Sequence, residues 1–93
     1  MISTHVLDTE HGRPAAGVRV ELYREDELLA AAETDADGRL ALANGLDAGS
    51  YRLVFAPDSA FFARVELEIR LDDGHYHVPL LFSPYGCTTY RGS

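Results

Sequence analysis

The stretch Val65-Glu66-Leu67-Glu68-Ile69-Arg70-Leu71 decides the fold, because apolar and charged residues alternate along it with a period of two. Successive side chains of a β-strand point to opposite faces of the sheet, so this stretch predicts a strand with one face in a core and the other in water. The same alternation runs through residues 17–24 and 50–56. Half-buried strands are therefore expected to build most of the chain.

Turn sequences rich in glycine, proline, asparagine and aspartate separate these strands. Short strands between frequent turns are typical of a sandwich or a barrel. Residues 28–33 are rich in alanine, so a helical turn is an alternative to a strand there. The segment is too short for a stable helix, so we favour a strand. Eight strands are expected, at residues 3–8, 17–24, 28–34, 39–42, 50–56, 62–71, 75–82 and 87–91.

The size of the chain limits its stability and its organisation. Ninety-three residues are expected to form a single domain, residues 1–93, whose core is so small that a lone monomer is only marginally stable. Cys87 is the only cysteine, so no internal disulfide can add stability, which leaves a metal or oligomerisation.

The net charge and the hydropathy of the chain limit which partners and which cellular location are expected. A net charge of −7 argues against nucleic acid and anionic membrane as partners. No apolar run approaches the roughly 20 residues that cross a bilayer, and the first residues show no signal-peptide pattern. With a free cysteine that suits a reducing compartment, a cytoplasmic protein is expected.

Histidines stand out on the strand expected at residues 75–82. On this strand His75, His77, Pro79 and Leu81 share one face, while the opposite face is wholly aromatic or aliphatic and is the better core face. His77 is therefore expected to point away from the core. It can be an ordinary surface histidine, and so can His5. Alternatively His5, His75 and His77 form a three-histidine metal site, although no carboxylate or thiol is visibly placed to complete or orient it.

Two arginines also draw attention by position. Arg39 directly follows the turn at residues 35–38, and Arg91 lies close to the end of the chain. Taken alone, Arg39 is a solvated arginine after a hairpin. Nothing special is expected of Arg91, because chain ends usually fray.

Longer motifs lie at both ends of the chain. The first runs from Ser3-Thr4-His5-Val6-Leu7-Asp8-Thr9 through Gly12-Arg13-Pro14-Ala15-Ala16-Gly17-Val18. The second contains His75-Tyr76-His77-Val78-Pro79-Leu80-Leu81, then Ser83-Pro84-Tyr85-Gly86, and closes on Thr89-Tyr90-Arg91-Gly92-Ser93. These motifs resemble the 5-hydroxyisourate hydrolases. The Tyr-Arg-Gly-Ser ending is that family's hallmark, and the related hormone-carrying transthyretins lack it.

The middle of the chain is less specific, because it also resembles carboxypeptidase-regulatory-like and other prealbumin-like modules. The resemblance implies an all-β, transthyretin/prealbumin-like antiparallel β-sandwich of about eight strands. Members of the hydrolase family usually carry a longer connection with a short helix where this chain has only residues 57–63. We therefore expect that helix to be reduced or absent. The chain also has Ala63 where a proline is usual and Cys87 where a tyrosine is common.

The activity implied by the resemblance is opening of the cyclic amide of 5-hydroxyisourate to 2-oxo-4-hydroxy-4-carboxy-5-ureidoimidazoline in urate degradation. The implied catalytic residues are His5, Arg39, His77 and Ser93. In this scheme His77 is the favoured general base and His5 assists proton transfer, although the division between the two histidines stays open. Arg39 holds and polarises the substrate, and Ser93 hydrogen-bonds to substrate or water. The implied substrate-binding residues are Arg39, Tyr90, Arg91, Gly92 and Ser93.

The same resemblance implies no cofactor and no metal, and an assembly as a homotetramer, a dimer of dimers with its active sites at the dimer–dimer interface. Two alternatives remain open. One is a transthyretin-like carrier that binds a small aromatic ligand without turnover, and the other is a prealbumin-like structural module.

Overall fold

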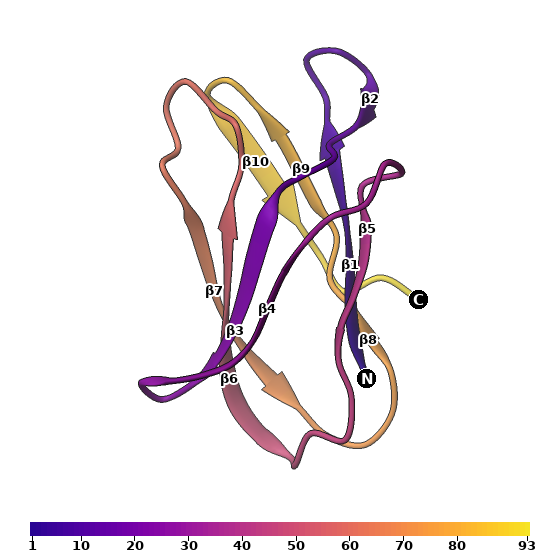
Figure 1. Ribbon diagram of the computed structural model, residues 1–93, viewed down its shortest axis with the longest axis vertical. Helices are drawn as coiled ribbons and strands as arrows, with labels where there is room; N and C mark the ends of the chain where they lie inside the picture. The colour runs from indigo at the N-terminus through magenta and orange to yellow at the C-terminus, as the bar shows by residue number, and fades with distance from the viewer.

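The computed structural model describes residues 1–93 and contains ten strands and no helix (Figure 1). Two sheets pack face to face, which confirms the predicted β-sandwich. The four-stranded sheet has the order β4-β3-β6-β7, and in the six-stranded sheet β10-β9-β1-β2 is the main path, with β5 and β8 also paired to β1. The strands are β1 (Ile2–Asp8), β2 (Arg13–Pro14), β3 (Arg19–Arg24), β4 (Glu27–Glu33), β5 (Arg39–Ala43), β6 (Gly49–Ala56), β7 (Val65–Leu71), β8 (Tyr76–His77), β9 (Leu80–Ser83) and β10 (Gly86–Thr89).

Most of the predicted strands are present, with some differences in their bounds: β3 begins at Arg19 and not at residue 17, and β10 ends at Thr89 and not at residue 91. The strand expected at residues 75–82 is divided into β8 and β9, because Pro79 has no N–H to donate to the ladder. The strand expected from residue 62 begins at Val65, and the two-residue β2 was not expected. The alanine-rich segment forms β4, so the strand prediction there is confirmed over the helical turn.

The connection between β6 and β7 contains no helix, as the shortness of residues 57–63 suggested. The Ser59 hydroxyl holds this connection together. Its oxygen accepts hydrogen bonds from the backbone N–H groups of Phe61 (3.2 Å) and Phe62 (3.1 Å), and the hydroxyl donates to the Pro84 carbonyl at 3.2 Å. A tight turn tied to the end of β9 thus replaces the helix.

Strand β1 lies in the middle of the six-stranded sheet. It pairs antiparallel with β2 and β5 on one edge and parallel with β8 and β9 on the other. The antiparallel arrangement predicted for the whole sandwich is therefore wrong for these two pairs. A parallel pair needs a long connection, and here more than sixty residues, including the entire four-stranded sheet, separate β1 from β8.

The hydrophobic core lies between the sheets and contains twelve buried residues. Val78, Leu80 and Phe82 belong to it, so the core face predicted for residues 75–82 is correct. Along β1, Ile2 and Val6 are buried and the intervening Thr4 donates its hydroxyl to the Val78 carbonyl at 2.6 Å. Because side chains alternate along a strand, the odd-numbered positions of β1 point out of the sandwich.

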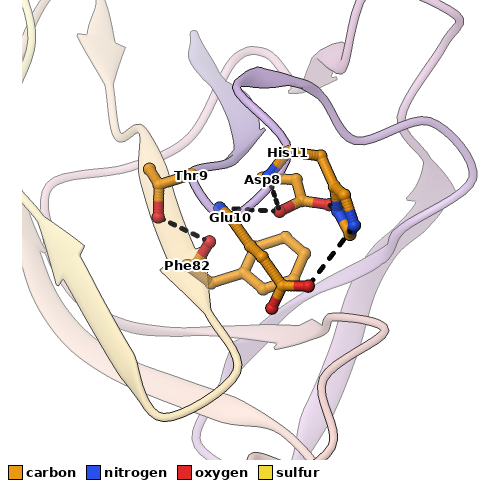
Figure 2. A network of polar contacts seen from close by, with 5 residues as sticks. All are labelled: Asp8, Thr9, Glu10, His11 and Phe82. Atoms are coloured by element: carbon orange, nitrogen blue, oxygen red, sulfur yellow. Dashed lines mark hydrogen bonds and ion pairs between the residues drawn. The ribbon is translucent and has the colours of Figure 1, made fainter.

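The turn after β1 is held by a polar network (Figure 2). Asp8 Oδ1 accepts hydrogen bonds from the backbone N–H groups of Glu10 (3.0 Å) and His11 (3.2 Å), and its Oδ2 lies 2.7 Å from His11 Nδ1. The hydrogen bond with the His11 side chain lowers the pKa of Asp8 below its usual value. The Thr9 hydroxyl donates to the Phe82 carbonyl at 2.9 Å, so the end of β1 is anchored to β9.

A second turn sets the position of Arg39. Asp35 Oδ1 accepts hydrogen bonds from the backbone N–H groups of Asp37 (2.9 Å) and Arg39 (3.0 Å). Gly38 adopts a positive φ of 73°, and its carbonyl accepts a hydrogen bond from the Val6 N–H at 2.8 Å. A Cβ at position 38 would lie 2.5 Å from the Val6 carbonyl oxygen, so only glycine lets the turn pack this closely on β1.

We expect Gly38→Ala to lower the free energy of unfolding much more than Gly12→Ala. Both glycines have a positive φ, which costs an L-residue about 1–2 kcal/mol, but a Cβ at Gly12 would meet nothing within 4 Å. The substitution at Gly38 adds a backbone clash to the same strain. Urea unfolding of the two variants measures the difference, and equal losses would show that the contact with Val6 is unimportant.

Candidate active site

The predicted catalytic side chains lie on the outer face of the six-stranded sheet, where three strands run side by side. On β1, Ser3 and His5 occupy the outward-pointing odd positions. His5 is paired with Arg39 of β5, and Ser3 lies between Ala41 of β5 and His77 of β8. The pairing of β1 with its two neighbours thus brings together residues that are more than 70 positions apart in the sequence.

A hollow of about 510 Å³ opens on this face. Three of the four predicted catalytic residues, Arg39, His77 and Ser93, line it. His5 is not among the lining residues, but it is the register partner of Arg39 in the pairing of β1 and β5. Ser3, for which the sequence predicted no role, also lines the hollow. The one sequence signal for Ser3 is that it shares the outward face of β1 with His5.

His77 is partly buried in this hollow and is surrounded by basic side chains. Burial lowers the pKa of His77 below its usual value of 6.5, and the positive charges of Arg39, His5 and His75 lower it further. Both effects disfavour the imidazolium, so the ring is neutral at pH 7. A neutral imidazole that lines an open hollow can accept a proton.

The hydroxyl of Ser3 holds the His77 ring. Ser3 Oγ lies 3.0 Å from His77 Nδ1 and 2.8 Å from His75 Nε2. The other nitrogen of His77, Nε2, makes no hydrogen bond within the chain and is left for a ligand or water. The ring is therefore oriented through one nitrogen and available through the other.

One ring nitrogen of His5 is hydrogen-bonded to the backbone. Its Nε2 lies 2.9 Å from the Asp37 carbonyl oxygen. A carbonyl can only accept, so Nε2 carries the proton, and Nδ1 is the nitrogen left for proton transfer. This contact ties His5 to the same turn that positions Arg39.

The last residues of the chain approach β8 closely. The Gly92 N–H donates to the His77 carbonyl at 2.6 Å, and a Cβ on Gly92 would lie 2.7 Å from Cδ2 of the His77 ring. This approach requires a residue without a side chain and brings Ser93 to the hollow.

Tyr90 and Arg91, which were also predicted to bind substrate, lie elsewhere in this chain. The Arg91 guanidinium stacks 4.3 Å above the Tyr76 ring, and Tyr76 points to the opposite face of β8 from His77. Both Tyr90 and Arg91 line a second, mostly apolar hollow of about 470 Å³ along β7, which holds none of the predicted catalytic groups. Tyr90 remains 55% exposed. The structure therefore gathers Gly92 and Ser93 around His77, but not Tyr90 and Arg91.

The three-histidine metal alternative has no support in the arrangement of the rings. His75 and His77 turn nitrogens to the Ser3 hydroxyl, and His5 turns one to the Asp37 carbonyl. No group of three or more histidine, cysteine, aspartate or glutamate side chains is arranged to hold a metal ion. The chain also has no helix long and apolar enough to cross a membrane.

The family model and the similar known proteins agree on one family. Residues 2–92 match the HIUase/Transthyretin family. The 5-hydroxyisourate hydrolase 2 of Rhizobium meliloti (strain 1021) is 43% identical, over 99% of this chain and 95% of that protein. That alignment spans 114 positions, more than the 93 residues of this chain, so the relative carries residues that are missing here.

Solved structures separate two branches of this fold. The 5-hydroxyisourate hydrolase of Klebsiella pneumoniae is 41% identical with a TM-score of 0.89, covering 99% of this chain and 97% of that one. Sea bream transthyretin, solved with thyroxine, has a similar TM-score of 0.90 but is only 25% identical, covering 98% and 93%. The backbone is equally close to both, while the side chains are closer to the hydrolase.

The environment of His77 predicts its titration. We expect NMR titration of wild-type protein to give a pKa for His77 below 6.5, and Arg39→Gln to raise that pKa, because it removes a positive charge facing the ring. Arg19→Gln, on β3 of the other sheet, is the matched control and should leave His77 unchanged. A His77 pKa at or above 6.5, or one that is unchanged by Arg39→Gln, would contradict the described surroundings of the ring.

Proposed function

The chain belongs to the HIUase/Transthyretin family, and from this premise we propose that the hollow around His77 opens the cyclic amide of 5-hydroxyisourate. The protein is a hydrolase of this kind. One observation carries the assignment of the reaction to this site: a neutral histidine, an arginine and the terminal serine line one hollow. These groups supply a base, a fixed positive charge and a hydrogen-bonding hydroxyl, which are the needs of amide hydrolysis.

His77 acts as the general base. Its free Nε2 takes a proton from water as the water oxygen attacks the amide carbonyl. The low pKa of His77 keeps the ring in the neutral form that this step requires at pH 7. The breaking C–N bond then needs a proton on the departing nitrogen, and His77 Nε2 can supply it.

Arg39 stabilises the negative charge that develops on the attacked carbonyl oxygen. Its guanidinium stays charged at every working pH and presents several N–H donors in a plane, which suits an oxygen-rich flat heterocycle. The hydrogen bonds of Asp35 and the packing of Gly38 hold the start of β5 in place. The side chain is thereby anchored at its base before substrate arrives.

His5 and Ser93 complete the site in this proposal. His5 assists proton transfer through Nδ1, since its Nε2 donates to the Asp37 carbonyl. Ser93 hydrogen-bonds to substrate or water from the chain end that Gly92 holds against β8. Arg91 contributes indirectly, because its stacking on Tyr76 fixes the segment that leads to Gly92. The chemistry assigned to these side chains requires no cofactor.

The comparisons favour the hydrolase over the carrier and the structural module. Relatives named 5-hydroxyisourate hydrolase cover nearly the whole chain at about 40% identity, whereas the transthyretins reach 25%. From the two end motifs that carry the resemblance to the enzyme, Ser3, His77 and Ser93 line the hollow, which supports the hydrolase.

We also propose that the working unit is a homotetramer in which the outer face of the six-stranded sheet meets another copy. The small core supports this, because only 18 of the 93 residues are buried in the single chain. The edges of β7 and β10 carry unpaired backbone groups, which favour pairing with another chain. The exposed Cys87 thiol supports a cytoplasmic location, because free thiols suit a reducing compartment.

We expect Arg39→Ala and His77→Asn each to lower turnover by a factor on the order of 10²–10⁴, the range for losing a charge-stabilising group or a general base. The assay follows the ultraviolet decay of 5-hydroxyisourate generated from urate by uricase. Both side chains lie outside the core, so the melting temperature should change little. His11→Gln, in the distant turn of Figure 2, is the control and should keep full turnover. Near-native rates in both site variants would refute the assigned site.

Deletion of Gly92 and Ser93 should abolish most turnover while the melting temperature stays within a few degrees. The deletion removes the hydrogen bond to the His77 carbonyl and the hydroxyl in the hollow, but no core residue. Paired activity and thermal-denaturation measurements check this. A deletion variant that works at the full rate would mean that the terminal residues take no part in the reaction.

Sedimentation at low micromolar concentration should give the mass of four chains. Burial of the outer sheet face and the free edges between copies would supply the stability that the small core lacks. A stable monomer with full activity would contradict the proposed assembly.

A further inference from the structure

Ser3 and His75 extend the polar network beyond the groups that the reaction scheme uses. Ser3 Oγ sits between two imidazoles, 3.0 Å from His77 Nδ1 and 2.8 Å from His75 Nε2. Ser3 is partly buried, whereas His75 is exposed to solvent. The three side chains therefore form a short chain of hydrogen bonds that runs from the hollow to bulk water.

The single proton of a hydroxyl gives this chain a direction. Ser3 can donate to only one of the two rings and must accept from the other. For His77 to act as a base through Nε2, its ring proton must be on Nδ1, which then donates to Ser3 Oγ. Ser3 in turn donates to Nε2 of His75. One arrangement of protons thus satisfies all three groups and leaves His77 Nε2 unprotonated.

We propose that Ser3 and His75 are positioning residues that hold the His77 ring in its Nδ1-protonated tautomer and connect it to solvent as a proton relay. The inference rests on the proposed function and adds two residues and a proton path to it. Protons balance along the path: water gives a proton to His77 Nε2, Nδ1 passes its proton to Ser3 Oγ, and the Ser3 hydroxyl passes its own to His75 Nε2. His75 then exchanges its excess proton with solvent. When the C–N bond breaks, His77 Nε2 gives its proton to the departing nitrogen, and the reverse sequence returns a proton from solvent through His75 and Ser3 to Nδ1.

The sheet makes this arrangement rigid. Ser3 is the register partner of His77 in the parallel pair of β1 and β8, and the Ser3 carbonyl accepts a hydrogen bond from the Val78 N–H at 2.9 Å. Strand β1 is central in its sheet, so Ser3 cannot move away from His77 without breaking the ladder on both sides. A residue held this way can fix the orientation of the neighbouring ring.

Burial and fixed charge favour movement of a proton away from His77. Desolvation lowers the pKa of His77, and the Arg39 guanidinium on β5 lowers it further. His5 on β1 also faces the ring, and the carboxylates of Glu33 and Asp35 line the same hollow. Once His77 accepts a proton, burial and the charge of Arg39 destabilise the imidazolium, and passage of the proton to the exposed His75 relieves this penalty.

NMR of the ¹⁵N-labelled wild-type protein tests the tautomer without any dependence on turnover. We expect the neutral His77 ring to carry its proton on Nδ1, and we expect Ser3→Ala to give a mixture of the two tautomers. Ser3→Thr keeps the hydroxyl and should restore the Nδ1 form. A wild-type ring with its proton on Nε2 would overturn the proposal, even in a protein that hydrolyses 5-hydroxyisourate.

Kinetics with added buffer test the relay itself. We expect His75→Phe to lower kcat about tenfold or more in weak buffer and added imidazole to restore much of the loss, because a small base can replace the missing proton acceptor. His11→Phe should change neither the rate nor its buffer dependence. A His75→Phe enzyme with the wild-type rate in weak buffer, or a loss that no buffer relieves, would overturn the relay. Absence of turnover in wild-type protein would instead refute the proposed function.

Discussion

The position of β1 in the six-stranded sheet is the constraint on which the rest of the structure depends. This single strand pairs with four others, antiparallel to β2 and β5 and parallel to β8 and β9. Its even-numbered residues Ile2 and Val6 close the core, while its odd-numbered Ser3 and His5 form the centre of the polar face. A slip of one residue would exchange the two faces, so core packing and site geometry are set by the same register.

The polar face around His77 is rich in basic side chains, in contrast to the acidic chain as a whole. The chain carries a net charge of −7, yet Arg39 and three histidines gather on one side of the sheet. Partial burial and these positive neighbours hold His77 neutral, and the Ser3 hydroxyl orients its ring. The same arginine therefore serves the proposed reaction twice, by keeping the base unprotonated and by stabilising negative charge on the substrate.

The local sequence pattern predicted most strands and the core face, but it could not predict features that depend on contacts between distant segments. Alternation of apolar residues is a property of each segment, so the strands and the core face of residues 75–82 were predictable. The parallel pairing of β1 with β8 was not, because nothing local tells a strand which partner it will have. Ser3 was missed for the same reason, since only that pairing brings it to His77. The placement of Arg91 over Tyr76 is likewise a tertiary contact that the terminal motif does not reveal.

We propose that this polar face hydrolyses 5-hydroxyisourate. The most direct test is the decay of freshly formed 5-hydroxyisourate, followed by ultraviolet absorbance with and without the wild-type protein. Because the compound also decays spontaneously, the measurement compares rates over a series of protein concentrations at pH 7. Catalysis by this face should give a decay rate that rises in proportion to protein concentration. A rate equal to the spontaneous one at every concentration would contradict it.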